Sequence, residues 1–149
     1  MKGEILFRGQ RYDKKQWVEG DLIHGVGLRK GKMYILPLHA NLASLEGCDP
    51  LDGYNAIPET IGQFTGLTDK NGTKIFEGDI IKAPSGRLYV VIWSTWIHDE
   101  KRNKFLTDRY EFTGWCISKD GINPCDTLDW ETLQGEVVGN VHDNPELLK

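Results

Sequence analysis

The fold is decided by residues 58–82, which read PETIGQFTGLTDKNGTKIFEGDIIK and predict a β-hairpin at the centre of the chain. Its turn ends in Asn71-Gly72, a pair typical of a type I′ turn, in which both central residues need positive φ. Apolar residues on both sides of the turn predict two strands. Within the second strand, Gly78 predicts a bulge or a close backbone approach, and Asp79 is expected to accept a nearby backbone N–H.

Three strings occur twice in the same order. They are Glu19-Gly20-Asp21, repeated as Glu77-Gly78-Asp79; GKMYIL at 31–36, repeated as GRLYVV at 86–91; and ETIGQ at 59–63, repeated as EVVGN at 136–140. Order, spacing and residue class agree, which predicts an internal duplication; chance similarity between unrelated hairpins is the alternative. The carboxylates of the first string could be catalytic, but both copies lack a histidine, which favours a structural role.

The predicted fold class is mainly β, with two related, small SH3-like barrel units formed by internal duplication and a short C-terminal helix. We expect a single domain over residues 1–149, with possible sub-units at 1–66 and 67–149. Asn144 as N-cap, followed by Pro145, predicts the terminal helix. Two segments stay open. Leu38, Leu42 and Leu45 are spaced for a short helix or lie in a loop. Asp126 could cap one helical turn through Trp130, and this segment fits a strand equally well.

The composition excludes several classes of protein. The chain has 149 residues, 39% of them hydrophobic, so it can fill a core. A formal charge of −4 gives no global attraction to nucleic acid. Cys48, Cys116 and Cys125 have no C-x-x-C spacing, which indicates reduced thiols in a cytoplasm rather than disulfides. No stretch approaches 18 apolar residues, so no membrane span or membrane partner is expected.

Three ordered blocks match a known family. They are FRGxR at 7–11 with WVxGD at 17–21, PETIGQFTGL at 58–67 with DKNG at 69–72 and FEGDI at 76–80, and VGNV at 138–141 with NPELL at 144–148. In these blocks the chain resembles the YopX family, small proteins carried by bacteriophages and prophages. The resemblance implies a β-rich fold, a phage or prophage origin and a location in the bacterial host cytoplasm. It transfers no catalytic residue, and residues 94–133 contain no string of the family.

An enzymatic role would need a constellation of histidines and carboxylates. The candidates are His98, Asp99, Glu100, His142 and Asp143. They could hold a divalent metal or act as acid and base, and a metal-dependent hydrolase using His98, Asp99 and His142 is one alternative function. No H-E-x-x-H spacing arranges them in advance, and the charge run that begins at His98 is typical of a solvated loop. Cys116 follows an apolar strand pattern, where a thiol is usually a small core residue. We therefore expect no catalytic residue, no metal and no cofactor.

Binding is the class of function that the sequence favours. Aromatic and basic residues that could stack on and attract single-stranded nucleic acid are Trp93, Trp96, Tyr110 and Trp115, with Arg87, Lys101, Arg102, Lys104 and Arg109. Core packing of the rings and a solvated charged face are the structural alternatives. A protein partner or self-association needs only an exposed strand edge. We therefore expect a non-enzymatic phage accessory protein that binds protein or forms a homo-oligomer, with nucleic acid as the alternative partner.

Overall fold

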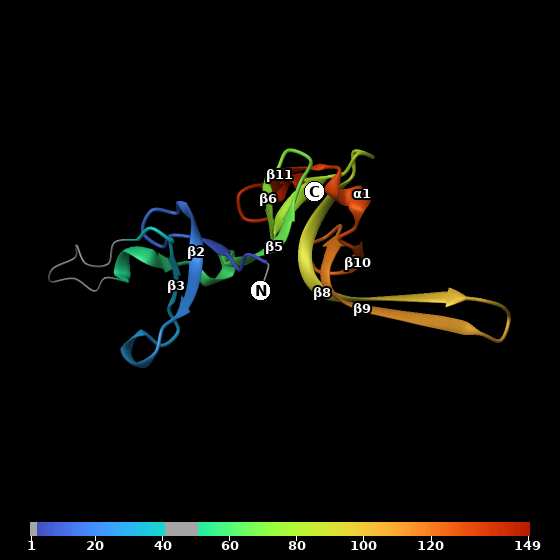
Figure 1. The fold of residues 1–149 in the computed structure, drawn as a ribbon, viewed down its shortest axis with the longest axis horizontal. Coiled ribbons are helices and arrows are strands. Elements are labelled where there is room, and N and C mark those ends of the chain that lie inside the picture. Colours follow the sequence, from blue (N-terminus) through green and yellow to red (C-terminus); the bar gives the residue numbers. More distant parts are fainter. Residues whose placement is uncertain (1–2, 41–50) are drawn as a thin grey trace. The chain divides into compact units, whose positions relative to one another are not determined.

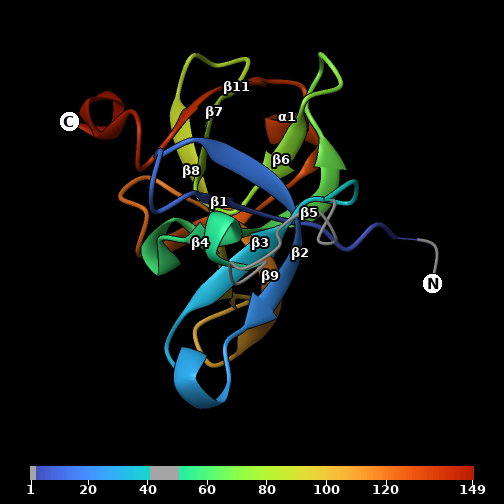
Figure 2. The ribbon, with the colours of Figure 1, turned by 90° about the vertical axis from the view of Figure 1, so that its left-hand side faces the viewer.

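A computed structural model of the chain describes residues 3–40 and 51–149. The chain is mainly β and divides into two compact units, residues 1–66 and residues 67–149. The boundary between Gly66 and Leu67 separates the two copies of the repeated strings, because the first copy ends at residue 63 and the second begins at residue 77. Figure 1 labels the elements, and Figure 2 shows the β2–β3 hairpin of the first unit ending in a short helical turn. Leu42, Leu45 and Cys48 lie outside the described residues.

The strands are short apart from two. They are β1 (Phe7–Gln10), β2 (Trp17–His24), β3 (Met33–Leu36), β4 (Asn55–Ala56), β5 (Gly62–Thr68), β6 (Lys74–Phe76), β7 (Asp79–Lys82), β8 (Leu88–Lys101), β9 (Thr107–Ser118), β10 (Pro124–Thr127) and β11 (Glu136–Asn140). The helical segments are η1 (Gly27–Arg29), η3 (Asp52–Tyr54), η4 (Pro58–Thr60), α1 (Trp130–Leu133) and η5 (Pro145–Leu148). None of the described helices is long and apolar enough to cross a membrane.

In the first unit the strands lie in the order β4-β3-β2-β1-β5, with antiparallel pairs throughout the first four. Tyr34 and Ile35 of β3 are fully buried although neighbouring strand residues point to opposite faces of the sheet, and Leu6 and Ala56 are buried as well. The sheet brings backbones unusually close at Gly20, where an added Cβ would lie 2.0 Å from the carbonyl oxygen of Leu36. A glycine is therefore required at this position because any side chain would collide with the neighbouring backbone.

The second unit contains a five-stranded antiparallel sheet in the order β10-β9-β8-β7-β11. Ile75, Ile81 and Val91 form its fully buried centre, and partly buried hydrophobic residues pack against them. The packed residues are Trp115, Leu128, Leu133 and Val137. These side chains come from β6, α1 and four strands of the sheet (β7, β8, β9 and β11), with Leu128 following directly after β10, so one core joins these elements.

The central turn forms where the sequence predicts it, but its type is different. Gly72 has φ of +78°, whereas Asn71 does not have positive φ. The N–H of Gly72 donates to the carbonyl of Asp69 at 3.0 Å, and the N–H of Asp69 donates to the carbonyl of Thr73 at 2.9 Å. This pattern is a type I turn followed by a left-handed residue rather than a type I′ turn. The reason is local: the Asp69 carboxylate accepts the N–H of Asn71 at 2.9 Å and favours the type I geometry.

The bend at the second Glu-Gly-Asp string has the predicted local support. Gly78 has φ of +85°, and the Asp79 carboxylate accepts the N–H of Phe76 at 2.8 Å. The Gly78 N–H donates to the carbonyl of Val91, and the Gly78 carbonyl accepts the N–H of Val141. Asp79 is 1% exposed, so Glu77-Gly78-Asp79 acts as a structural corner between β6 and β7.

Two of the three repeated strings pair in the same way. The strand after each Glu-Gly-Asp lies antiparallel to the following Gly-basic-apolar-Tyr strand. Ile23 is opposite Tyr34 in the first unit, and Ile81 is opposite Tyr89 in the second unit. The neighbouring pairs are equivalent too: Leu22 opposite Ile35 corresponds to Ile80 opposite Val90. The two strand pairs therefore have the same register.

The two copies differ in the strand partner of the third string and in the backbone geometry at Glu-Gly-Asp. β5 pairs with β1, with Arg8 opposite Gly62, whereas β11 pairs directly with β7. Gly20 lies inside β2 without positive φ, while Gly78 lies in the turn before β7. The internal duplication predicts that both Glu-Gly-Asp segments form equivalent strand-bulge-strand corners, and this prediction is wrong. Gly20 serves a close backbone approach instead of a bend.

The region from residue 94 to 133 is more regular than the sequence indicates. The charge run from His98 to Lys101 belongs to β8 rather than to a loop, and Arg109 lies in β9. Residues 124–127 form β10, and α1 follows with Asp129 as N-cap, its carboxylate accepting the N–H of Thr132 at 2.9 Å. The short terminal helix is present as the 3-10 segment η5, with Pro145 in its first turn.

Candidate functional site

A long hairpin of the second unit extends beyond the sheet and forms the arm, defined here as residues 94–114 of β8, β9 and their loop (Figure 1). The pairing of β7 with β8 ends at Val90, and the pairing of β10 with β9 ends at Cys116. β8 and β9 pair with each other along the whole arm. Among the described strands, none lies along either outer edge of the arm.

One face of the arm is aromatic. Residues with even numbers share this face, because Trp96 is opposite Phe112 and His98 is opposite Tyr110 in the antiparallel register. The rings of Trp96 and His98 stack with centroids 5.3 Å apart, and those of His98 and Tyr110 are 6.5 Å apart. Tyr110 is 50% exposed. Phe112 lies over Gly114, where an added Cβ would be 2.8 Å from the ring. The face is therefore an ordered, solvent-accessible row of rings.

The opposite face holds the base of the arm in shape. Trp93 and Trp115 meet edge to face with ring centroids 5.0 Å apart, directly before the arm begins. One step further out, the hydroxyl groups of Thr95 and Thr113 lie 2.8 Å apart and share a hydrogen bond. Ile97, the next residue on this face, is 47% exposed. Cross-strand pairs of these kinds are the contacts that stabilise a two-stranded ribbon.

The loop at the tip is also ordered by local bonds. The Asn103 side-chain oxygen accepts the N–H groups of Phe105 and Leu106, at 2.8 and 3.0 Å. The N–H of Arg102 donates to the carbonyl of Leu106. Phe105 is 88% exposed, so the turn presents an apolar ring to solvent.

The arm brings together six of the nine residues predicted to bind nucleic acid: Trp96, Lys101, Arg102, Lys104, Arg109 and Tyr110. Arg87, Trp93 and Trp115 lie outside it. Its charges balance, with four basic and four acidic side chains in residues 94–114. Arg102 forms an ion pair with Asp108, and Arg109 forms one with Asp99 at 3.6 Å. A surface that attracts phosphate needs a local excess of positive charge, and this arm has none.

The structure does not assemble the predicted metal site. No group of three or more His, Cys, Asp or Glu side chains is placed to hold a metal ion in residues 3–40 and 51–149. His98 and Asp99 lie on the arm, on opposite faces of β8. His142 follows β11, where its N–H donates to the Asn140 side-chain oxygen at 3.0 Å. The hydrolase alternative requires His98, Asp99 and His142 to converge, and they do not, because His98 and Asp99 are adjacent in a strand and point to opposite faces.

Cys116 is a core residue rather than a nucleophile. Its side chain is fully buried, and its sulfur lies 3.6 Å from the carbonyl oxygen of Ser94. Burial raises the pKa of the Cys116 thiol, which keeps it protonated and unreactive at neutral pH.

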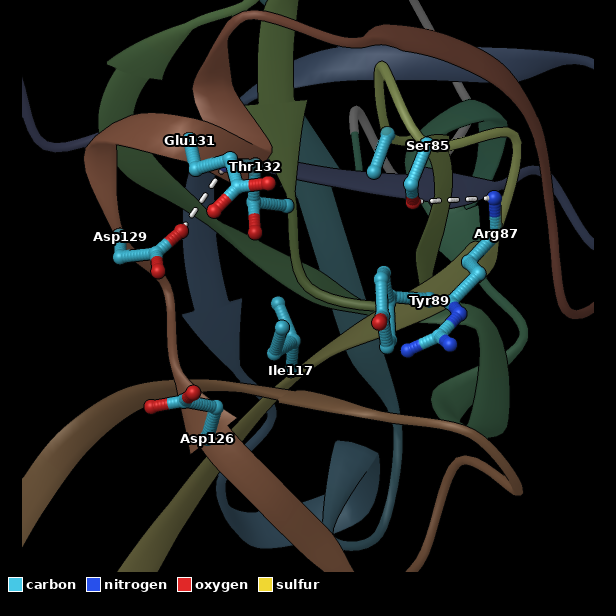
Figure 3. A pocket seen from close by; sticks show the side chains of 9 residues that line it. Ser85, Arg87, Tyr89, Ile117, Asp126, Asp129, Glu131 and Thr132 are labelled. Carbon is cyan, nitrogen blue, oxygen red and sulfur yellow. Dashed lines mark hydrogen bonds between the residues drawn. The ribbon is translucent and has the colours of Figure 1, made fainter.

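A small pocket in the second unit gathers charged residues that the sequence does not link. It has a volume of about 200 Å³. In Figure 3, Asp126, Asp129 and Glu131 lie on one side, and Arg87 and Tyr89 lie on the other. Asp129 is already engaged as the N-cap of α1, and no histidine or cysteine lines the pocket. These acidic residues have no distinctive spacing, so no sequence signal identifies them as neighbours of Arg87.

The fold and the site define the class of protein: a two-unit, mainly-β protein with an exposed β-ribbon arm. The chain belongs to the YopX family, because the family model described as YopX protein matches residues 6–149. Membership in this family indicates a phage-type protein.

A solved structure resembles the whole chain. The crystal structure of protein EF1440 from Enterococcus faecalis matches with a TM-score of 0.51 and 21% sequence identity. The match covers 99% of this chain and 100% of that chain. This similarity concerns the fold, and it extends across both units. A comparison with curated proteins finds no match.

Proposed function

We propose that this chain is a non-enzymatic accessory protein of a phage or prophage that acts in the bacterial host cytoplasm by binding a protein partner through its arm. The observation that supports the proposal is the arm itself, a ribbon with two unpaired edges and an exposed aromatic face. A two-stranded ribbon outside a core is marginally stable in water, so its length and order favour a binding role. Unpaired strand edges and exposed rings are the features by which proteins capture protein partners.

The balance of charge selects protein over nucleic acid. Tyr and Trp are enriched where proteins bind proteins, and Arg109, held beside Asp99, is pre-oriented for a polar contact. A phosphate backbone would instead meet four carboxylates on the arm.

Site-specific photo-crosslinking tests the proposal. A photoreactive residue is placed at Tyr110 and, as a matched control in the same unit, at Trp130, which is 76% exposed and lies outside the arm. In phage-infected host cells, we expect a cross-linked product that joins this chain to a second protein chain, either another copy or a different protein, from the Tyr110 position only. Equal products from both positions, or products from Trp130 alone, would contradict the proposal.

A shortened arm supplies the complementary variant. Replacing residues 95–113 by Asn-Gly joins Ser94 to Gly114, which already lie opposite each other. The core residues Ile75, Ile81 and Val91 are untouched, so the variant should fold and melt like the parent chain. We expect it to lose the partner captured at Tyr110. Retention of the same partner would overturn the role of the arm.

Single-stranded nucleic acid is the second candidate ligand, favoured by the stacked rings of Trp96, His98 and Tyr110. Binding of this kind would be largely electrostatic and would fall steeply with added salt. Replacing both Lys101 and Arg102 by alanine should weaken it, while replacing Lys119, an exposed lysine outside the arm, should not. Absence of single-strand binding at low salt would remove this candidate. A metal-dependent hydrolase is not proposed, because its three residues do not converge.

We also infer that the two units arose by duplication of a small SH3-like ancestor. The shared register of β2 with β3 and of β7 with β8 supports this history, since Ile23–Tyr34 and Ile81–Tyr89 are equivalent pairs. The different neighbours of β5 and β11 imply that the third strand changed its partner afterwards. Expression of residues 67–149 alone tests the inference, because a unit that descends from a self-contained ancestral domain should fold by itself. Failure of this fragment to fold would count against it.

A further inference from the structure

The outer edge of β9 has an ordered set of unpaired backbone groups. In an antiparallel strand, the N–H and C=O of one residue point to the same side, and the side alternates along the strand. The carbonyl of Trp115 accepts the N–H of Leu128 at 2.9 Å, so Trp115 points away from β8. The register of β9 is continuous from Thr107 to Ser118. The backbone groups of Thr107, Arg109, Glu111 and Thr113 therefore also point outward, along an edge that no described strand covers.

We propose that a second copy of this chain pairs with this edge, antiparallel to it, about a two-fold axis that passes beside Tyr110. The inference rests on the proposed function, because it names one protein partner of the same arm. In this arrangement Arg109 lies opposite Glu111 of the second copy, and Glu111 lies opposite Arg109. Thr107 and Thr113 lie opposite each other in the same way. Each of these pairs joins two residues whose backbone groups face outward, as an antiparallel ladder requires.

The charges of β9 select this register. A two-fold axis at Arg109 would place two arginines opposite each other, and an axis at Glu111 would place two glutamates opposite each other; both arrangements are destabilising. With the axis at Tyr110, both opposing pairs are of opposite charge, and a neutral ring occupies the axis. Glu111 forms no ion pair within the described part of the chain, so its carboxylate is available to the second copy.

The outer edge of β8 is a poorer match. Its outward residues include Asp99 and Lys101, because the carbonyl of Val91 points outward to Gly78. Placing Asp99 opposite Lys101 of a second copy puts the axis at Glu100, where two carboxylates would meet. The β9 edge therefore carries the self-complementary pattern. A two-fold pairing also closes on itself, so it gives a dimer rather than a fibre.

Charge exchange tests the register directly. Glu111→Arg leaves two arginines opposite each other in a homodimer, and Arg109→Glu leaves two glutamates. We expect each variant alone to dimerise at least about tenfold more weakly than the parent chain in sedimentation equilibrium. Mixing the two variants restores opposite charges at both positions, so a one-to-one heterodimer should form. Recovery of association in the mixture also shows that both variants are folded.

A cysteine on the axis supplies an independent readout. Residues opposite each other at such a position have Cα atoms about 4.5 Å apart, a separation that a disulfide can bridge. Tyr110→Cys, in a chain with Cys48 and Cys125 replaced by serine, should form a disulfide-linked dimer under mild oxidation. Phe112→Cys is the matched control. Residue 112 lies opposite Asp108 of the second copy, so this variant should form no disulfide-linked dimer under the same conditions.

The outcomes separate this inference from the proposed function. A parent chain that stays monomeric at roughly tens of micromolar overturns the dimer, yet a partner captured only at Tyr110 would still support the arm as a binding site. A dimer that forms equally in all charge variants, and cross-links equally at both cysteine positions, overturns the β9 edge as its interface. Association restored only in the mixture supports the register.

Discussion

Replacing Asp69 by asparagine should lower the free energy of unfolding by about 2–4 kcal/mol at neutral pH. The Asp69 side chain is 6% exposed. One carboxylate oxygen accepts the N–H groups of Asn71 and Thr73, both at 2.9 Å, and the other accepts the N–H of Val137 at 2.9 Å. Asparagine has only one acceptor oxygen, so its amide nitrogen must face a backbone donor. At least one charged hydrogen bond is lost, and a buried N–H is left unpaired.

The same variant should change the pH dependence of stability. Burial by itself raises the pKa of Asp69, but the N–H groups of Val137, Thr73 and Asn71 together lower it below its ordinary value. A carboxyl whose folded-state pKa is lowered adds stability above its unfolded pKa of about 3.9 and loses it as pH falls through the folded pKa. The parent chain should therefore lose this contribution on acidification below about pH 4, whereas the asparagine variant has none to lose.

Urea unfolding followed by tryptophan fluorescence measures both effects. Four of the five tryptophans lie in the second unit, so the signal reports mainly on the unit that contains Asp69. Asp99→Asn is the matched control, because its 56% exposed side chain forms a surface ion pair worth about 0–1 kcal/mol. Two outcomes would contradict the role of Asp69 in bonding the turn to β11. One is an equal loss of unfolding free energy in Asp69→Asn and Asp99→Asn at neutral pH. The other is an equal loss of stability on acidification in the parent chain and in Asp69→Asn.

Three further outcomes follow from the backbone and the thiols. Gly72→Val should cost about 1–3 kcal/mol and Gly72→Asn under about 1, since asparagine tolerates positive φ; equal losses in thermal melts would contradict this. Gly27 also has positive φ, of +59°, but valine there should cost less than at Gly72 because no strand register depends on it. Gly20→Ala should destabilise the first unit by about 3 kcal/mol or more, measured by hydrogen exchange, because its Cβ meets backbone. Peptide mapping should find Cys125 alkylated well before Cys116, since only Cys116 is fully buried.

Signals that act over a few residues predict this structure well. Asn71-Gly72 marks the hairpin, Asp79 accepts a backbone N–H at the corner, and Asn144-Pro145 begins the final helical turn. Each of these three features depends on interactions between residues at most four positions apart, so a short stretch of sequence is enough to predict it. The type of the central turn depends on one more group, the Asp69 carboxylate. A single side-chain hydrogen bond is enough to change the preferred turn geometry.

Strand partners are harder to predict because they depend on distant segments. The strings at 59–63 and 136–140 are alike, yet β5 pairs with β1 and β11 pairs with β7. The charge run that begins at His98 has the composition of a loop, but its part from His98 to Lys101 is a strand because β9 supplies a cross-strand partner for each of these residues. Propensity for strand is set largely by such neighbours. The sequence identifies the candidate binding residues by their aromatic or basic side chains. That they lie on one arm follows only from the pairing of β8 with β9.

The residues of the arm, which are the candidates for binding, differ from the residues that stabilise the fold. The buried centre at Ile75, Ile81 and Val91 does not include any residue of the arm. Contacts along the arm are the Thr95–Thr113 hydrogen bond, the stacked rings and the surface ion pairs, each worth about 0.2–1 kcal/mol. They hold the ribbon in shape without anchoring the sheet. Substitutions at Tyr110 or Glu111 should therefore leave the unfolding of the second unit nearly unchanged while altering association, and a loss of both properties together would show that the arm belongs to the core.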